Sequence, residues 1–191
     1  NLQGHDGPVF VLTGDAPLMR AESFAALLKD YREMNAACVI GTARTAANFG
    51  LGRIVRSPQG EFLKIVEQKD ATPEEAAIQE INVGCYVFNG RLLFEALKEL
   101  QPNNKQGEYY LTDCAAILKK NGHRVVAAEK LDIREALGVN TRAQMVEIHR
   151  TMQQEWMEKL LLAGVTIVEP AQTYIDLRAK IGEDTVIYPF T

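Results

Sequence analysis

A short apolar run that ends abruptly in a Gly-Asp-Ala-Pro segment constrains the fold of this chain most. Val9–Leu12 is rich in β-branched residues, which is typical of a strand buried on both faces of a parallel sheet. Gly14 and Asp15 end that run, and Pro17 prevents further ladder pairing. A helical stripe and a second apolar run at 36–40 follow, so this stretch predicts one βαβ unit. The stripe consists of Phe24, Leu27, Leu28 and Tyr31.

The remaining sequence to residue 128 continues to alternate strands and helices, with one antiparallel excursion. This alternation predicts an α/β fold with a mixed, doubly wound sheet. Leu93, Leu97 and Leu100 are expected to face the core from one helix, which Pro102 ends. The expected elements are a loop at 41–52, a hairpin at 54–66 that turns at 57–60, a capped helix start at 72–75, a strand at 82–88, a helix at 112–120 followed by Gly122, and a strand at 124–128.

The last third of the chain has a different pattern. A long amphipathic helix is expected at 141–163, and its apolar side is more typical of packing than of cofactor binding. That side consists of Met145, Ile148, Met152, Trp156 and Leu160. Beyond Gly164, Ile181 and Ile187 lie six positions apart, which is one hexapeptide of a possible repeat; repeat folds need at least three.

Composition excludes several classes of protein. The net charge of −4, without a Lys/Arg block, argues against a nucleic-acid surface. No apolar run approaches the ~20 residues that a membrane span requires. The three cysteines, Cys38, Cys85 and Cys114, lie far apart without a C-x-x-C pair, which predicts buried, reduced thiols and a cytoplasmic location. None of the histidines has a partner at metal-ligand spacing.

Six motifs in a fixed order carry a resemblance to one enzyme family. They are LTGDAPL at 12–18, GLGRI at 50–54, IVEQKDA at 65–71, EINVG at 80–84, QGEYYLTD at 106–113 and GVNTR at 138–142. Together they resemble the bifunctional bacterial N-acetylglucosamine-1-phosphate uridylyltransferases/glucosamine-1-phosphate acetyltransferases. LLLAGV at 160–165 resembles that family's junction with a left-handed parallel β-helix.

The resemblance implies a domain organisation and an incomplete machinery. It implies a Rossmann-like uridylyltransferase domain at 1–141, a linker helix at 142–164 and the start of a left-handed β-helix acyltransferase domain at 165–191. Two parts of the family have no counterpart here: the Gly-rich, Arg- and Lys-bearing segment that cradles the triphosphate, and the later β-helix coils. Thr13 also replaces the aromatic residue of many members. We therefore expect this chain alone to be a fragment without activity.

The implied reaction joins UTP and N-acetylglucosamine 1-phosphate into UDP-N-acetylglucosamine and pyrophosphate, with Mg²⁺. Two polyanions must meet, so the barrier is mostly electrostatic and positional. The resemblance makes Asp15 and Asn140 the catalytic metal ligands, and Asn140 also a substrate contact. From the residues alone, Asp15 could equally turn the chain or cap a helix, and Asn140 could be the N-cap of the long helix.

The resemblance also assigns substrate contacts to Gly14, Gly52, Glu67, Asn82, Tyr110 and Thr112. Glu67 would accept hydrogen bonds from sugar hydroxyls, and Asn82 would donate and accept at hydroxyls or at the acetamido group. Their alternatives remain open from sequence. Glu67 could be a solvated charge at a strand end and Asn82 a turn residue at a strand edge. Tyr110 could be a packed ring and Thr112 the N-cap of the helix at 112–120.

Partners follow from the same resemblance. Acetyl-CoA is expected only in the complete protein, which would form a homotrimer once the β-helix is complete; no nucleic acid or membrane is expected. Two other functions fit the residues less closely. One is a nucleotidyltransferase for another hexose 1-phosphate, and the other is a non-catalytic, oligomerising fragment.

Overall fold

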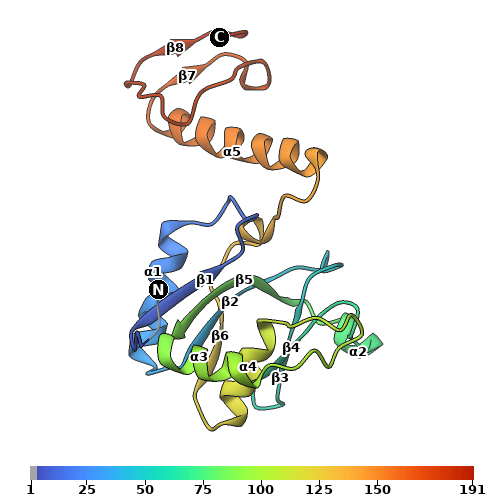
Figure 1. The fold of residues 1–191 in the computed structure, drawn as a ribbon. Coiled ribbons are helices and arrows are strands. Elements are labelled where there is room, and N and C mark those ends of the chain that lie inside the picture. Colours follow the sequence, from blue (N-terminus) through green and yellow to red (C-terminus); the bar gives the residue numbers. More distant parts are fainter. Residues whose placement is uncertain (1–3) are drawn as a thin grey trace. The chain divides into compact units, whose positions relative to one another are not determined.

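The computed structural model describes residues 4–191 and divides the chain into two units, one up to Leu137 and one of Gly138–Thr191. Residues 1–3, the first of the predicted 1–141 domain, lie outside the described residues. The elements of the first unit are β1 (Pro8–Leu12), α1 (Ala21–Glu33), β2 (Cys38–Arg44), β3 (Arg53–Arg56), β4 (Phe62–Val66), α2 (Pro73–Ala76), β5 (Glu80–Asn89), α3 (Gly90–Glu99), α4 (Thr112–Lys120), β6 (Val125–Glu129) and the 3₁₀ helix η1 (Ile133–Ala136) (Figure 1).

The ten-residue strand β5 organises a mixed sheet in the order β4-β3-β5-β2-β6, with β1 paired to β5. β5 runs antiparallel to β1, β2 and β3, whereas β2 and β6 are parallel. β1 and β2 therefore run in the same direction, as the βαβ prediction requires, but β5 lies between them. The prediction of one antiparallel excursion at 53–66 was wrong, because the β5 strand also reverses direction.

The strand β1 packs on both faces of the sheet, with Val9 and Val11 against one core and Phe10 against the other, but its side chains are only partly buried. Within the described residues its only strand partner is β5, and both ends of β1 are exposed. The apolar run at Val9–Leu12 identified the strand correctly but not its antiparallel pairing with β5. The composition of a strand indicates how apolar it is, but its neighbouring strands and helices are set by distant parts of the chain.

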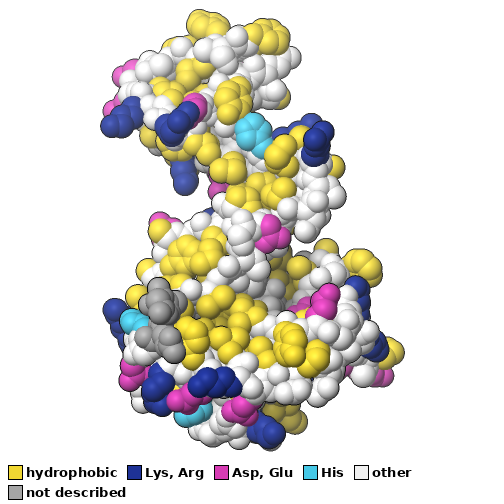
Figure 2. Space-filling view, viewed as in Figure 1, with side chains coloured by type: hydrophobic (Ala, Val, Ile, Leu, Met, Phe, Trp, Pro, Cys, Tyr) yellow, Lys and Arg dark blue, Asp and Glu magenta, His cyan; other side chains and the backbone are white. Residues whose placement is uncertain are grey.

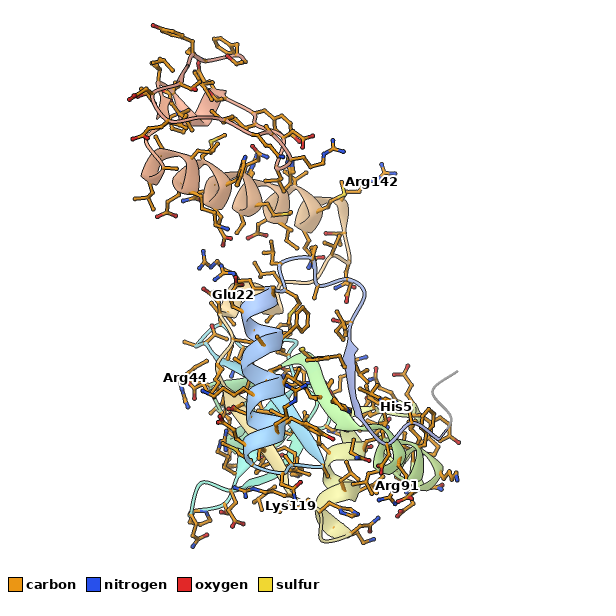
Figure 3. All side chains as sticks on the ribbon, turned by 90° about the vertical axis from the view of Figure 1, so that its left-hand side faces the viewer. His5, Glu22, Arg44, Arg91, Lys119 and Arg142 are labelled. Atoms are coloured by element: carbon orange, nitrogen blue, oxygen red, sulfur yellow. The ribbon has the colours of Figure 1, made fainter. Side chains whose placement is uncertain are left out.

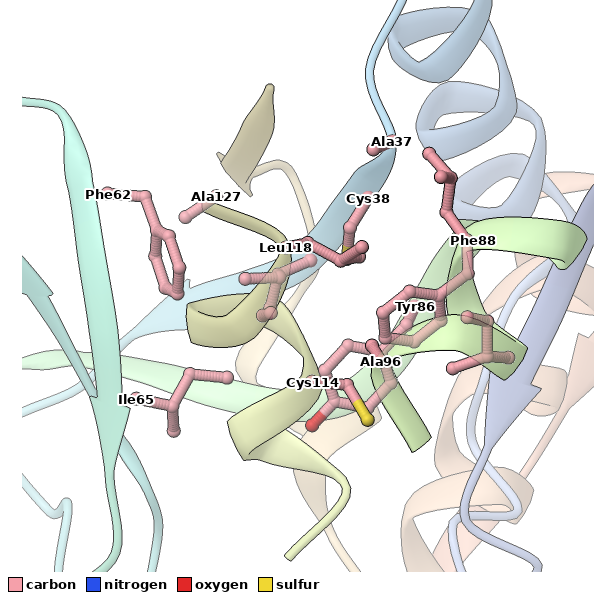
Figure 4. Close-up of a cluster of buried hydrophobic side chains, with 14 of the residues drawn as sticks. Ala37, Cys38, Phe62, Ile65, Tyr86, Phe88, Ala96, Cys114, Leu118 and Ala127 are labelled. Atoms are coloured by element: carbon pink, nitrogen blue, oxygen red, sulfur yellow. The ribbon is translucent and has the colours of Figure 1, made fainter. Parts of the chain in front are cut away.

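Alternating side chains of the strands build a core on each face of the sheet. Tyr86 and Phe88 pack on one face with α3 and α4, which Figure 4 shows in close-up. Cys85 and Val87 point to the opposite face, where α1 packs through Leu27. Helices on both faces of a mixed sheet confirm the predicted α/β fold with a mixed, doubly wound sheet.

Local sequence signals placed most of the other elements well. α4 has the predicted bounds, and Gly122 follows it with a φ of 82°. The hairpin turns at Ser57–Gly60, and Thr72 caps α2 through a capping box. Two details were wrong: β2 extends to Arg44 into the expected loop at 41–52, and Leu97 is 38% exposed. The three cysteines are buried and free, as expected.

Some charged side chains of the first unit lie on its surface and others are buried, such as Arg53 and Glu80. Glu22 occupies the first turn of α1, where a negative charge favours the helix dipole (Figure 3). Arg44, at the end of β2, forms an ion pair with Glu129 at 2.8 Å. None of the helices within residues 4–191 is long and apolar enough to cross a membrane.

The second unit contains α5 (Arg142–Leu162), β7 (Thr166–Ile167), the 3₁₀ helix η2 (Pro170–Gln172) and β8 (Val186–Ile187). Ile148 and Leu160 face inward as expected, whereas Met145 is 53% exposed. Gln153 is also buried on the inner side of α5, where its amide forms two hydrogen bonds with the backbone of Ile175. β7 and β8 pair in parallel. Hydrophobic side chains gather on the visible face of each unit (Figure 2).

Candidate functional site

The candidate site lies where one edge of β5 changes its partner strand. That edge pairs with β3 at Ile81 and with β1 from Cys85 onward. Between these two points Gly84 has a φ of 82°, and the pairing of β5 with β2 shifts register. Such a bulge redirects the side chains beside it. Asn82 therefore lies at a break in this edge of β5, between the start of β3 and the end of β1.

Gly52 and Glu67 face each other on the hairpin side of this break. The backbone N–H of Asn82 donates to the Gly52 carbonyl at 2.9 Å, which joins the start of β3 to β5. A Cβ at Gly52 would lie 3.3 Å from both carboxylate oxygens of Glu67 and 3.1 Å from Cγ2 of Ile65. The Gly52 backbone therefore approaches the Glu67 carboxylate more closely than a side chain would permit.

The Glu67 carboxylate is partly buried and accepts a hydrogen bond from the Thr112 hydroxyl at 3.3 Å. Burial raises the pKa of Glu67, and the negative charges of Asp113 and Asp70 act in the same direction. The Thr112 hydrogen bond and the Arg53 guanidinium oppose that rise in pKa. Glu67 is therefore an oriented carboxylate, and the alternative of a solvated strand-end charge was wrong.

Asn82 is held in one orientation by two neighbours on its own strand. The Gly84 N–H donates to Asn82 Oδ1 at 3.1 Å, and Asn82 Nδ2 donates to the Tyr86 hydroxyl at 2.6 Å. An amide has two acceptor lone pairs and two N–H donors, so each end keeps capacity for a ligand. We call Gly52, Glu67, Asn82 and Thr112 the β5 cluster, because hydrogen bonds or close approach join them around this strand.

The loop after β1 lies against the same bulge. A Cβ built on Gly84 would be 3.3 Å from Cγ2 of Thr13, so these two residues are neighbours. Gly14 and Asp15 follow Thr13 and are exposed, and a Cβ at Gly14 would meet nothing within 4 Å. The structure thus brings this loop to the β5 cluster through Thr13 and leaves the Asp15 carboxylate open to solvent.

Glu135 anchors the far end of that loop. Its buried carboxylate accepts from the Arg20 backbone N–H at 2.9 Å and from the Ser23 hydroxyl at 2.8 Å. It also accepts from the backbone N–H of Asp132 at 3.0 Å. Arg20 is the N-cap residue of α1, so these hydrogen bonds tie the start of α1 to Glu135. Sequence reasoning missed this residue, because a contact 115 positions away leaves no local pattern.

Tyr110 lies on a loop that is tied to the segment after Glu67. The Lys105 N–H donates to Asp70 Oδ1 at 3.0 Å, and Lys105 Nζ donates to the Lys69 carbonyl at 2.6 Å. The Tyr110 hydroxyl accepts a hydrogen bond from Gln106 of the same loop. These contacts place the loop beside the chain that carries Glu67.

Two further alternatives, the N-cap roles of Asn140 and Thr112, are contradicted. Thr141, not Asn140, is the N-cap of α5; it forms a capping box with Gln144, which also accepts from the Asn140 N–H at 2.9 Å. Leu111 occupies the N-cap position of α4, and Thr112 is its first residue. Asn140 belongs to the second unit, whereas Asp15 and the β5 cluster belong to the first. The proposed pairing of Asp15 with Asn140 stays a prediction.

Asp15 and Asn140 each carry an oxygen donor of the kind that a magnesium ion takes. Among residues 4–191, no group of three or more His, Cys, Asp or Glu side chains could hold a metal. Asp15 offers an exposed carboxylate and Asn140 an exposed amide, both with hard oxygen atoms. Mg²⁺ is commonly bound by one or two protein oxygens together with waters and substrate phosphates.

Comparison with protein families gives one match that covers most of the chain. A model described as nucleotidyl transferase matches residues 1–157. The match includes Asp15, Asn140 and the whole β5 cluster.

Curated relatives match nearly the whole chain. The bifunctional protein GlmU of Lactobacillus gasseri is 46% identical over 186 residues, which is 97% of this chain and 40% of the relative. The bifunctional protein GlmU of a Geobacillus species is 47% identical over 190 residues, covering 100% of this chain and 41% of the relative. The chain therefore spans about two fifths of the length of these relatives.

Solved structures share the fold at low sequence identity. Apo UDP-glucose pyrophosphorylase superimposes with a TM-score of 0.59 at 15% identity, over 81% of this chain and 56% of that one. A UDP-glucose pyrophosphorylase complexed with UDP-glucose gives a TM-score of 0.57, also at 15% identity, over 81% of this chain and 58% of that one. At this identity the likeness establishes the fold alone.

Proposed function

Because this chain belongs to the nucleotidyl transferase family, we propose that it carries the sugar-phosphate side of an N-acetylglucosamine-1-phosphate uridylyltransferase. The reaction joins UTP and N-acetylglucosamine 1-phosphate, and releases UDP-N-acetylglucosamine and pyrophosphate. The observation that carries the proposal is the β5 cluster, in which Glu67 and Asn82 are oriented at one break in the sheet. The curated relatives that match nearly the whole chain are bifunctional GlmU proteins.

The chemistry of the cluster suits a sugar. Glu67 supplies a carboxylate that accepts from hydroxyl groups, and Asn82 supplies one donor and one acceptor. Gly52 lets the backbone approach the ligand, since any side chain there would meet Glu67. Tyr110 and Thr112 come from the loop and helix that close on Glu67 and would add contacts from that side. Gly14 would let the loop backbone approach the substrate phosphate.

Asp15 and Asn140 would hold the magnesium ion. The ion would neutralise negative charge on the substrate phosphates, so that two polyanions could approach each other. The task of the chain is positional: β1 and Glu135 fix the two ends of the loop that carries Asp15. Such positioning lowers the barrier because the reactants need no further ordering.

We also propose that the second unit begins a further domain. α5 would be a linker helix over 142–164, and residues 165–191 the first coil of a left-handed β-helix. The parallel pairing of β7 with β8, between Thr166 and Val186, supports this assignment. A complete β-helix would carry transfer of an acetyl group from acetyl-CoA to glucosamine 1-phosphate, form a homotrimer and work in the cytoplasm.

A pyrophosphate-release assay tests the proposal. The protein at its full natural length is supplied with UTP, Mg²⁺ and one sugar phosphate at a time. We expect turnover with N-acetylglucosamine 1-phosphate, and at least tenfold lower kcat/KM with glucose 1-phosphate. Faster turnover with glucose 1-phosphate would assign the chain to another hexose-1-phosphate nucleotidyltransferase. No turnover with any sugar phosphate would refute an enzymatic role in this reaction.

A further inference from the structure

Tyr86 is a buried residue that the assignment of the site leaves without a role. It lies on β5 four positions after Asn82, is 3% exposed, and stacks on Phe88 with ring centroids 5.5 Å apart. Its ring belongs to the core on the α3 and α4 face (Figure 4). Its hydroxyl accepts the hydrogen bond from Asn82 Nδ2 at 2.6 Å. The ring therefore has a packing role, and the hydroxyl contacts the β5 cluster.

The bulge at Gly84 makes this contact possible. Asn82 pairs with Thr42 and Tyr86 pairs with Ile40, so the three residues between them on β5 oppose only one residue on β2. The extra residues shorten the distance between the two side chains, and Gly84 adopts the left-handed conformation that the bend requires. The bulge that interrupts the pairing along the edge of β5 thus also allows the Asn82–Tyr86 hydrogen bond.

Two hydrogen bonds fix the orientation of the Asn82 side-chain amide. The Gly84 N–H can only donate, so it determines which end of the amide carries the oxygen. The Tyr86 hydroxyl accepts from the other end and fixes the angle of the amide plane. With both partners in place, one lone pair of Oδ1 and one N–H of Nδ2 remain for a ligand.

We propose that the Tyr86 hydroxyl is a positioning residue that gives the site its preference for an acetamido sugar over a sugar with a free hydroxyl. An acetamido group has a fixed donor and a fixed acceptor, and it matches an amide held at one angle. A hydroxyl rotates to donate or accept, so it tolerates an amide that turns. This inference rests on the proposed function, because it takes Asn82 as a contact of the sugar.

The variant Tyr86→Phe tests the inference, since it removes one hydroxyl and keeps the packed ring. We expect the KM for N-acetylglucosamine 1-phosphate to rise about five- to tenfold, as for the loss of one hydrogen bond. The KM values for glucose 1-phosphate and UTP should change less than about twofold. Tyr31→Phe, in the α1 core, is the matched control and should leave all three KM values unchanged.

A double variant with Asn82→Ala distinguishes positioning through Asn82 from a general effect on the fold. In Asn82→Ala, the further change Tyr86→Phe should not alter the KM of either sugar phosphate. Equal rises for both sugars in Tyr86→Phe, or effects that add in the double variant, would overturn the inference. An unchanged acetamido-sugar KM in Tyr86→Phe would also overturn it. If Asn82→Ala itself leaves that KM unchanged, the proposed sugar site fails instead.

The hydrogen bond can also be observed without turnover. In the free protein, a side-chain N–H proton of Asn82 should exchange slowly with solvent in the ¹H–¹⁵N NMR spectrum. We expect Tyr86→Phe to accelerate this exchange at least tenfold and Tyr31→Phe to leave it unchanged. Equally rapid exchange in the wild-type protein would show that Tyr86 does not hold the amide, and would refute the inference.

Discussion

Substitution of Gly52 by alanine perturbs the β5 cluster by a single methyl group. Gly52 has no positive φ, so alanine can adopt its backbone conformation. The new Cβ would lie 3.1 Å from Cγ2 of Ile65 and 3.3 Å from both oxygens of Glu67. Carbon atoms pack best at about 3.5–4.0 Å, so these neighbours must move by a few tenths of an ångström.

The two neighbours respond differently to that methyl group. Ile65 is buried in the core, whereas the Glu67 carboxylate is the end of a flexible side chain held at 3.3 Å by Thr112. We expect the carboxylate to move and the Thr112 hydrogen bond to break, at a cost of about 1 kcal/mol in stability. A displaced carboxylate also loses a charged hydrogen bond to the sugar, which corresponds to about 10- to 100-fold weaker binding.

Gly41→Ala is the matched steric control. Its Cβ would lie 3.0 Å from Cδ2 of Leu131 and 3.2 Å from the Cys85 carbonyl, in the core under α1. Urea unfolding and calorimetric titration with N-acetylglucosamine 1-phosphate are measured for both variants. Gly41→Ala should lose stability and keep its affinity, whereas Gly52→Ala should lose affinity. If Gly52→Ala binds the sugar phosphate as tightly as the wild type, the close approach to Glu67 has no role in binding.

Three further predictions concern other parts of the site. Asp15→Asn should abolish pyrophosphate release with Mg²⁺ at an unchanged melting temperature, because the side chain is exposed; wild-type turnover would contradict this. Burial raises the pKa of Glu67, so as the pH is lowered the sugar affinity should begin to fall at a higher pH than the pKa of free glutamate would give. Over the same pH range, lowering the pH should raise the free energy of unfolding relative to that of Glu67→Gln, because the folded state binds the proton more tightly. A free energy of unfolding that falls instead would contradict the assignment. Glu135→Ala should lower the free energy of unfolding in urea by roughly 3 kcal/mol, since three donors lose their acceptor; a loss under about 1 kcal/mol would contradict its role in anchoring the loop.

The sequence predicted those features that depend on local patterns. Thr72 and Pro73 marked the start of α2, and Gly122 marked the end of α4, because caps and left-handed residues have strong local preferences. The side chains gathered at β5 were named from motifs 15 to 60 positions apart, which only a family resemblance could link. Their contacts with one another came from the structure.

Other features could not be predicted because they depend on distant pairing. The apolar run at Val9–Leu12 predicts a strand equally well in the centre or at an edge of a sheet. The insertion of β5 between β1 and β2 is a matter of topology and leaves no local pattern. No sequence pattern singled out Tyr86, since only the bulge at Gly84 brings its hydroxyl to Asn82.

A crystal structure of the full-length protein with N-acetylglucosamine 1-phosphate would test the central claim most directly. The account predicts the sugar at the break in the edge of β5, with a hydroxyl within hydrogen-bond distance of Glu67. It also predicts the acetamido group against the amide of Asn82. An ordered sugar phosphate bound away from Glu67 and Asn82, with these two side chains keeping only their present partners, would contradict the account.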